Sequence, residues 1–373
     1  MVTDTLSFTN VLREKNISFT DGVRFVRVPS PGKDAKNRSC SIDKSSGRVY
    51  DFVNNESISF ETYMELMGEP VNNLKISFEE QAVDDTPTRI IRAQKLWTSS
   101  AQVTKFSSPV YKYLSNRGLP DNEIEWLIKY DLVREFNDTK GKIAVVMPIK
   151  AEGWGETITG VQRIYITKNG EKDESNGPAK KMFGVHGTGG LVIPADSTIG
   201  NKNDRVILAI VEGPETGAAV HAALTLEGRL RCEVFVAYDT GGVKKGLKAV
   251  DLYAIKTFKQ AIDVIIFQDH DLPVPVMSKD GSVQKMKPAP GQLAADQLTE
   301  KLRSSGWTVK SADPPPIQPG GDHKRDWLDV YIRNPQEIRD KVYELFPKYK
   351  LSHEINSGAL EKSSYFFNDR DRT

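Results

Sequence analysis

The chain has 373 residues, 38% of them hydrophobic and 27% charged, which is ordinary for a water-soluble globular protein. Its 51 Lys and Arg residues are balanced by 50 Asp and Glu residues, so any basic surface for nucleic acid must be local. Two cysteines, Cys40 and Cys232, exclude a disulfide framework and a four-cysteine zinc site. The sequence has no export signal and no apolar run of roughly 18 residues, so we expect a cytoplasmic protein without a membrane partner.

The N-terminal part predicts a small unit followed by a linker and a group of helices. In residues 1–70, the apolar runs at 40–42 and 49–52 flank the turn "KSSG" and predict a β-hairpin. Residues 71–88 are polar and predict a linker. Residues 90–130 have helical patterning, and Gly118 is the type of residue that commonly follows a helix end.

The pattern then changes to strands. Residues 142–149 and 157–166 predict two strands, and residues 168–190 predict a loop that carries the Lys180-Lys181 pair. From residue 205 onward, the apolar runs 205–213, 232–239 and 263–271 alternate with helical segments. Short Val- and Ile-rich runs separated by amphipathic helices are typical of a parallel sheet, which we place at 205–335, before a helical and polar tail at 336–373.

Acidic residues stand where two of these strands end. Glu212 closes the first run, and Asp269 and Asp271 close the third run. The carboxyl ends of parallel strands form the functional edge of an open sheet, so these side chains are expected to converge. Carboxylates packed that closely need a positive partner, and a hard divalent cation is the simplest one. Asp326 and Asp329 lie one helical turn apart in "RDWLD" and are expected to project to the same side.

These motifs together resemble the Toprim domain of bacterial-type primases, most of all the variety in phage and plasmid primases. The resemblance rests on "EGPET" at 212–216, "FQDHD" at 267–271 and "RDWLD" at 325–329. Four segments that precede these motifs in the chain also resemble the family and occur in its order: "LWTSSAQV", "YLSNRGL", "GVQRIYI" and "AKKMFG". The resemblance implies an α/β fold in which a compact parallel Toprim sheet, flanked by helices, follows an α+β primase-core-like region at 90–200.

The resemblance also implies an activity, which is template-directed synthesis of short RNA primers on single-stranded DNA from ribonucleoside triphosphates. Glu212, Asp269 and Asp271 then match the catalytic acids, and Asp326 and Asp329 complete a site for Mg²⁺ or Mn²⁺. Glu215 has two interpretations, a supporting acid behind the metal ligands or a favourable charge at a helix start. The candidate contacts to nucleotide or nucleic acid are basic, and each has a plainer alternative as a surface or helix-capping residue: Arg117, Arg163, Lys180 and Lys181.

The sequence departs from the family at two points. The unit at 1–70 looks like the zinc ribbon that opens such primases, but it keeps a single Cys40, so no zinc is expected. No Gly-x4-Gly-Lys-Ser/Thr motif is present, so unwinding of DNA would need a separate replicative helicase. Two other interpretations stay open: a metal-dependent nuclease, and a non-catalytic protein that binds nucleic acid or a helicase.

Overall fold

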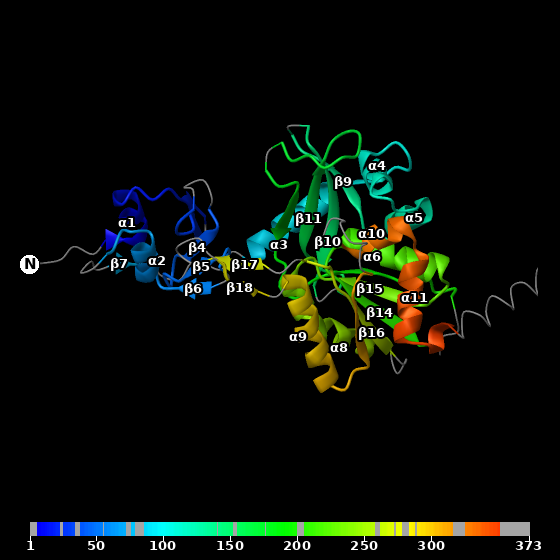
Figure 1. The fold of residues 1–373 in the computed structure, drawn as a ribbon. Helices are drawn as coiled ribbons and strands as arrows, with labels where there is room; N and C mark the ends of the chain where they lie inside the picture. The colour runs from blue at the N-terminus through cyan, green and yellow to red at the C-terminus, as the bar shows by residue number, and fades with distance from the viewer. Residues whose placement is uncertain are drawn as a thin grey trace, which may run out of the picture. The chain divides into compact units, whose positions relative to one another are not determined.

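The computed structural model (Figure 1) divides the chain into two compact units, Met1–Pro87 and Thr88–Thr373. The residues that it describes are 6–22, 25–33, 38–54, 56–71, 76–78, 86–139, 141–151, 155–175, 177–199, 205–257, 262–271, 274–277, 283–287, 289–315 and 325–350. All the acidic and basic residues singled out above lie in these ranges. The last part of the predicted tail, 351–373, lies outside them.

The first unit is built on a five-stranded antiparallel sheet. Its strands pair in chain order: β2 (Thr20–Asp21), β3 (Phe25–Val28), β4 (Cys40–Asp43), β5 (Val49–Asp51) and β6 (Glu56–Ile58). The predicted hairpin is the β4–β5 pair, but the sheet is larger because short segments on both sides also pair with it. Two helices, α1 (Phe8–Glu14) and α2 (Phe60–Leu66), contribute to its core, and each begins at a serine whose side chain caps the helix.

A hydrogen-bonded aspartate lies inside this first unit. Asp51 is buried, and its Oδ2 accepts hydrogen bonds from the Ser30 hydroxyl and the Asn54 amide, both at 2.8 Å. Burial by itself would raise the pKa of Asp51, but the hydrogen bonds from Ser30, Val53 and Asn54 hold that pKa below its usual range. The nearby Cys40 thiol is buried, and burial raises its pKa to about 11. Cys40 is therefore protonated at neutral pH.

The second unit begins with three helices and an antiparallel sheet. The helices are α3 (Thr86–Ser99), α4 (Pro109–Asn116) and α5 (Asp121–Lys129). The sheet has the order β12-β11-β10-β9-β8, formed by Lys180–Gly184, Ile158–Ile166, Ile143–Lys150, Arg134–Asn137 and Ala101–Gln102. The prediction of a loop throughout 168–190 is wrong at β12. Its sequence "KKMFG" lacks β-branched residues, and the strand forms because it pairs with β11 over five residues.

A second sheet follows, and four of its five strands are parallel. The order is β13-β15-β14-β16-β19, formed by Leu191–Ile193, Cys232–Val236, Val206–Val211, Ile262–Phe267 and Val309–Ala312. Only the edge strand β13 is antiparallel to its neighbour. A separate hairpin pairs β17 (Val274–Met277) with β18 (Val283–Lys287). The parallel sheet predicted from the three apolar runs is therefore present, with one antiparallel edge.

Helices cover both faces of this parallel sheet (Figure 1). One face packs against α6 (Pro214–His221), the π-helix Ala222–Glu227, α10 (Trp327–Arg333) and α11 (Gln336–Leu345). The other face packs against α7 (Thr240–Lys244), α8 (Gly246–Thr257) and α9 (Pro290–Ser304). The first hydrophobic core also includes residues of α4, α5 and β10, so the two sheets of the second unit share one core. Within the described residues, none of the helices is long and apolar enough to cross a membrane.

A buried ion cluster ties the C-terminal segment to the start of β16. Asp263 is fully buried and accepts two hydrogen bonds from the Arg205 guanidinium, at 2.8 and 2.7 Å. Lys348 Nζ lies 2.6 Å from the same carboxylate, and the Tyr349 hydroxyl donates to it at 2.7 Å. The residues that follow α11 are therefore held to the end of the sheet opposite the acidic residues.

Candidate active site

Two of the predicted acidic segments leave the parallel sheet side by side. Val211, the last residue of β14, pairs in parallel register with Phe267, the last residue of β16. Glu212 directly follows the first of these strands, and Asp269 comes two residues after the second. Because neighbouring strands lie about 4.8 Å apart, the two acidic segments start at the same edge of the sheet.

The third acidic segment is joined to the second one by backbone and side-chain contacts. The backbone of His270 donates to the Arg325 carbonyl at 2.8 Å, so Asp271 and Asp326 flank a direct backbone contact. The Trp327 indole donates to the Gln268 carbonyl at 3.1 Å, and its ring stands edge-on to Phe267 at 5.0 Å. Trp327 is fully buried. The tryptophan thus anchors the start of α10 beside the end of β16.

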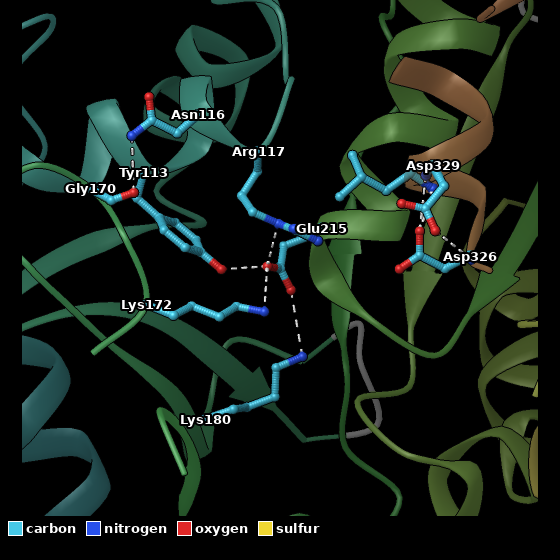
Figure 2. Close-up of polar contacts among 10 residues, drawn as sticks. Tyr113, Asn116, Arg117, Gly170, Lys172, Lys180, Glu215, Asp326 and Asp329 are labelled. Carbon is cyan, nitrogen blue, oxygen red and sulfur yellow. Dashed lines mark hydrogen bonds and ion pairs between the residues drawn. The ribbon is translucent and has the colours of Figure 1, made fainter. Parts of the chain in front are cut away.

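Asp326 and Asp329 face each other across the first turn of α10, as Figure 2 shows. Asp326 Oδ1 accepts hydrogen bonds from the backbone N–H groups of Leu328 and Asp329, at 2.9 and 3.0 Å. Asp329 Oδ2 in turn accepts from the backbone N–H of Asp326 at 3.2 Å, which completes a capping box. Burial raises the pKa of Asp326, and the negative charges of Asp329 and Glu215 raise it further, while Arg117 opposes them. A cation would offset this concentration of negative charge.

The donor chemistry of these segments suits Mg²⁺ or Mn²⁺, because all five predicted ligands are carboxylates. Among the described residues, however, no three His, Cys, Asp or Glu side chains are gathered closely enough to hold an ion by themselves. Mg²⁺ is commonly held by one or two carboxylates together with water and substrate phosphates, so a complete protein cage is not needed. Gly291, at the start of α9, leaves room at this edge, since a Cβ there would lie 3.1 Å from Asp271 Oδ2.

Glu215 is the centre of a basic cluster, which we call the Glu215 cluster (Figure 2). Its carboxylate lies 3.3 Å from Arg117 Nε, 4.0 Å from Lys172 Nζ and 3.5 Å from Lys180 Nζ. The Tyr113 hydroxyl donates a hydrogen bond to Oε1. These partners come from α4, the residue after it, the β11–β12 connection and β12, while Glu215 lies in the first turn of α6. One carboxylate thus holds three cations in place.

The charge of Glu215 is stabilised by these neighbours. Glu215 is 6% exposed, and burial by itself would raise its pKa. Lys180, the Tyr113 hydroxyl, Lys172 and Arg117 outweigh burial and hold the pKa of Glu215 below its usual range. Burial, reinforced by the Glu215 charge, raises the pKa of Tyr113. At neutral pH the cluster therefore combines one carboxylate with three cations and has an excess of positive charge.

A cavity opens next to the Glu215 cluster. It has a volume of about 570 Å³ and is lined by Tyr113, Asn116, Arg117, Gly170, Glu171 and Lys172. The Asn116 side chain donates to the carbonyls of Asn169 and Gly170, at 2.9 and 3.1 Å, and so fixes one wall of the cavity. Arg117 and Lys172 line the cavity and also pair with Glu215. A phosphate group that enters the cavity therefore meets their positive charges.

The four predicted basic residues do not gather in one place. Arg117 and Lys180 belong to the Glu215 cluster. Ile164 pairs with Lys180 and Arg163 pairs with Lys181 across β11 and β12, and successive residues of a strand point to opposite faces. Ile164 belongs to the shared core, whereas Arg163 lies over the rings of Tyr165 and Phe183. Lys181 and Arg163 therefore point away from the Glu215 cluster.

Sequence reasoning missed four residues that the structure brings to this region. Tyr113 and Lys172 join the Glu215 cluster from segments about 60 residues apart in the chain. His186 Nδ1 lies 3.0 Å from Asp239 Oδ2, and Asp239 follows β15, the strand next to β14. The acid at the end of the second apolar run, in "VFVAYD", was the available signal for Asp239. Tyr113 opens the segment "YLSNRGL", which is part of the resemblance, whereas Lys172 and His186 belong to no motif.

Replacing Glu215 with glutamine should destabilise the protein by about 2 kcal/mol at pH 7, because hydrogen bonds to a charged group contribute about 1.5–3 kcal/mol. Since the folded-state pKa of Glu215 is lowered, its contribution is present above the ordinary glutamate pKa and is lost as the pH falls through the folded value. Denaturant unfolding at several pH values should therefore show a difference between wild type and Glu215→Gln that shrinks below about pH 4. The exposed Glu156→Gln is the matched control, and an equal loss in that variant would contradict the role of the cluster.

Comparisons with known proteins identify one sequence family and several solved structures. Residues 87–193 match a family described as a domain of unknown function, DUF7146. Among curated proteins, none matches the chain. The primase fragment of the bacteriophage T7 primase-helicase is 13% identical with a TM-score of 0.38, and the alignment covers 85% of this chain and 99% of that one. The zinc-binding and RNA polymerase domains of the Aquifex aeolicus primase are 14% identical with a TM-score of 0.38, over 90% of this chain and 82% of that one.

Proposed function

We propose that the protein is a DNA primase of the Toprim type, which joins ribonucleotides on a single-stranded DNA template by metal-dependent nucleotidyl transfer. The observation that carries the proposal is the convergence of three acidic segments at one edge of a parallel sheet. Glu212 leaves β14, Asp269 leaves β16, and Asp326 is brought beside them by Trp327 and the His270–Arg325 backbone contact. This is the edge at which open α/β sheets bind their ligands.

The Glu215 cluster supports the same proposal. Arg117 lies near enough to lower the pKa of both Glu215 and Asp326. A positive charge therefore lies beside the acidic segments. A nucleoside triphosphate needs cations on its phosphates and carboxylates that hold metal ions beside the reacting phosphate. Acidic and basic groups that adjoin in this way suit a triphosphate better than a neutral substrate.

Each group has a role in the proposed reaction. Glu212, Asp269, Asp271, Asp326 and Asp329 would hold Mg²⁺ or Mn²⁺, which when bound would neutralise the triphosphate and favour attack by the 3′ oxygen. Arg117, Lys172 and Lys180 bind the phosphates, and Glu215 fixes the three cations so that little side-chain entropy is lost on binding. The Tyr113 hydroxyl orients the Glu215 carboxylate. We extend the proposal to a cytoplasmic location and to a separate helicase as a replication partner.

Primer synthesis tests the proposal directly. Purified protein is incubated with single-stranded DNA, labelled ribonucleoside triphosphates and either Mg²⁺ or Mn²⁺, and the products are separated by size. The proposal predicts short labelled RNA that depends on the template and on the divalent ion. Cleavage of the DNA without any labelled RNA would instead support a nuclease, and DNA binding without either reaction would support a non-catalytic protein.

A further inference from the structure

The first sheet of the second unit has a face that points away from the Glu215 cluster. It carries Arg163 and Tyr165 on β11 and Lys181 and Phe183 on β12, with Lys142 just before β10, and we call it the Tyr165 face. Arg163 is paired with Lys181 on one side and with Val146 on the other, so these side chains lie on the same face. Val146 and Val161 are buried on this face, whereas Tyr165 and Arg163 are half-buried and Lys181 is exposed.

Helix α3 covers only part of this face. Its Trp97 packs with Val146 and Val161, and Phe183 borders the same small core. The Arg134 guanidinium lies over the Trp97 ring at 4.5 Å from its centroid. Beyond this core, a hollow of about 230 Å³ is lined by residues that include Lys142, Tyr165 and Lys181. Helix α3 therefore covers one part of the Tyr165 face, and the part around Tyr165 and Lys181 stays open.

Cations surround the Tyr165 ring. Lys142 Nζ lies 5.7 Å, Lys181 Nζ 5.4 Å and Arg163 Cζ 5.5 Å from its centroid. Arg163 also lies 4.9 Å from the centroid of Phe183, and its buried Nε has no hydrogen-bond partner. Within the part of the chain that the structure describes, neither Arg163 nor Lys181 forms a salt bridge with a carboxylate. Their charge is left available to a ligand.

We propose that the Tyr165 face binds a single strand of nucleic acid, with a base stacked at Tyr165 and the backbone phosphates held by Arg163 and Lys181. Aromatic rings interleaved with cations are the combination that single-strand binding uses, because every base has a face that can stack and every nucleotide carries a phosphate. Asp138 and Asp173 also line the hollow, and carboxylates repel phosphates, so the proposal places the phosphates at Arg163 and Lys181 rather than beside these acids. This binding lies on the opposite face of the sheet from the Glu215 cluster and does not require catalysis.

Binding of fluorescent oligonucleotides, measured by anisotropy, tests this proposal. The probes are a dT oligomer and an rU oligomer of equal length, which distinguish a DNA strand from an RNA strand. Tyr165→Ala should weaken binding of the preferred probe roughly 5-fold to 100-fold, and Tyr165→Phe should bind like wild type because the ring is kept. Arg163→Gln and Lys181→Gln should each lower the slope of log affinity against log salt by roughly 0.7. The matched control is Tyr130→Ala directly after α5, where a lysine also lies over a tyrosine ring.

A second measurement covers the case in which Tyr165→Ala does not fold. Ultraviolet cross-linking of wild type to an oligonucleotide that contains 5-bromouracil should attach it to the β11 or β12 peptide, as read by mass spectrometry. The proposal is overturned if wild type binds neither probe, if folded Tyr165→Ala binds like wild type, or if the cross-link maps elsewhere. If Tyr165→Ala weakens binding but wild type makes no primers, only the primase proposal is refuted. If wild type makes primers and Tyr165→Ala binds the probes like wild type, only the present proposal is refuted.

Discussion

Asp269→Asn is expected to lower the rate of primer synthesis about a thousandfold, because a metal-held charge contributes several kcal/mol to the transition state and about 1.4 kcal/mol corresponds to each factor of ten. Asparagine keeps the size of the side chain and one carbonyl oxygen but removes the negative charge. Asp269 is half-buried just beyond β16, and the neighbouring His270–Arg325 contact involves only backbone atoms. The fold should therefore persist in this variant.

The control for this prediction is Asp296→Asn, which makes the same chemical change on the exposed surface of α9. Steady-state rates should be measured with both variants at saturating nucleotide over a range of Mg²⁺ concentrations. We expect the control to match wild type and Asp269→Asn to stay inactive even at high Mg²⁺. Full activity of Asp269→Asn would remove Asp269 from the metal site and would weaken the assignment of the whole acidic edge.

Asp263→Ala should have the largest effect on stability, about 3–5 kcal/mol less free energy of unfolding, because it removes a fully buried carboxylate on which two cations and a hydroxyl converge. Asp263 is fully buried, and its carboxylate receives hydrogen bonds from Arg205 and Tyr349 and an ion pair from Lys348. The partially exposed Arg205 and Lys348 can still reach water, which places the expected loss toward the lower end of that range.

The pH dependence of this loss has a definite sign. Burial by itself would raise the pKa of Asp263, but hydrogen bonds from Arg205, Lys348 and Tyr349 hold it below its usual range. Its stabilising contribution is therefore present above the ordinary aspartate pKa of about 3.9 and is lost as the pH falls through the folded value. Chemical denaturation should show a large difference between wild type and Asp263→Ala at pH 7 and a small one near pH 2. The exposed Asp313→Ala should unfold like wild type, and a pH-independent difference for Asp263→Ala would refute this account.

Much of the parallel sheet could be predicted from sequence because buried parallel strands leave a continuous apolar signal. The runs ending at Glu212 and Asp269 became β14 and β16, and Gly118, predicted at a helix end, lies just past α4 with a φ of +81°. In these cases the local pattern and the tertiary environment agree, so the sequence alone is sufficient.

The pairing of residues across the first sheet could not be predicted in the same way. The segment "KKMFG" becomes a strand only because β11 supplies hydrogen bonds, and it is this strand that sends Lys180 and Lys181 to opposite faces. The same limit applies to Glu215, whose partners Tyr113 and Lys172 come from distant segments. Its position in the first turn of α6 agrees with a helix-start charge, but only the tertiary structure reveals the three cations around it. The acids' role as metal ligands stays a prediction.

The most direct test of the proposed primase activity is the base composition of its products. Wild type should be incubated with Mg²⁺, all four ribonucleoside triphosphates and a single-stranded template that contains one block of a single base, and the products should be identified by mass spectrometry. Template-directed nucleotidyl transfer predicts short RNA chains that begin with a 5′-triphosphate and carry the complement of the block, and they should be absent when the template is withheld. RNA whose composition ignores the template, or DNA fragments in place of RNA, would contradict the account.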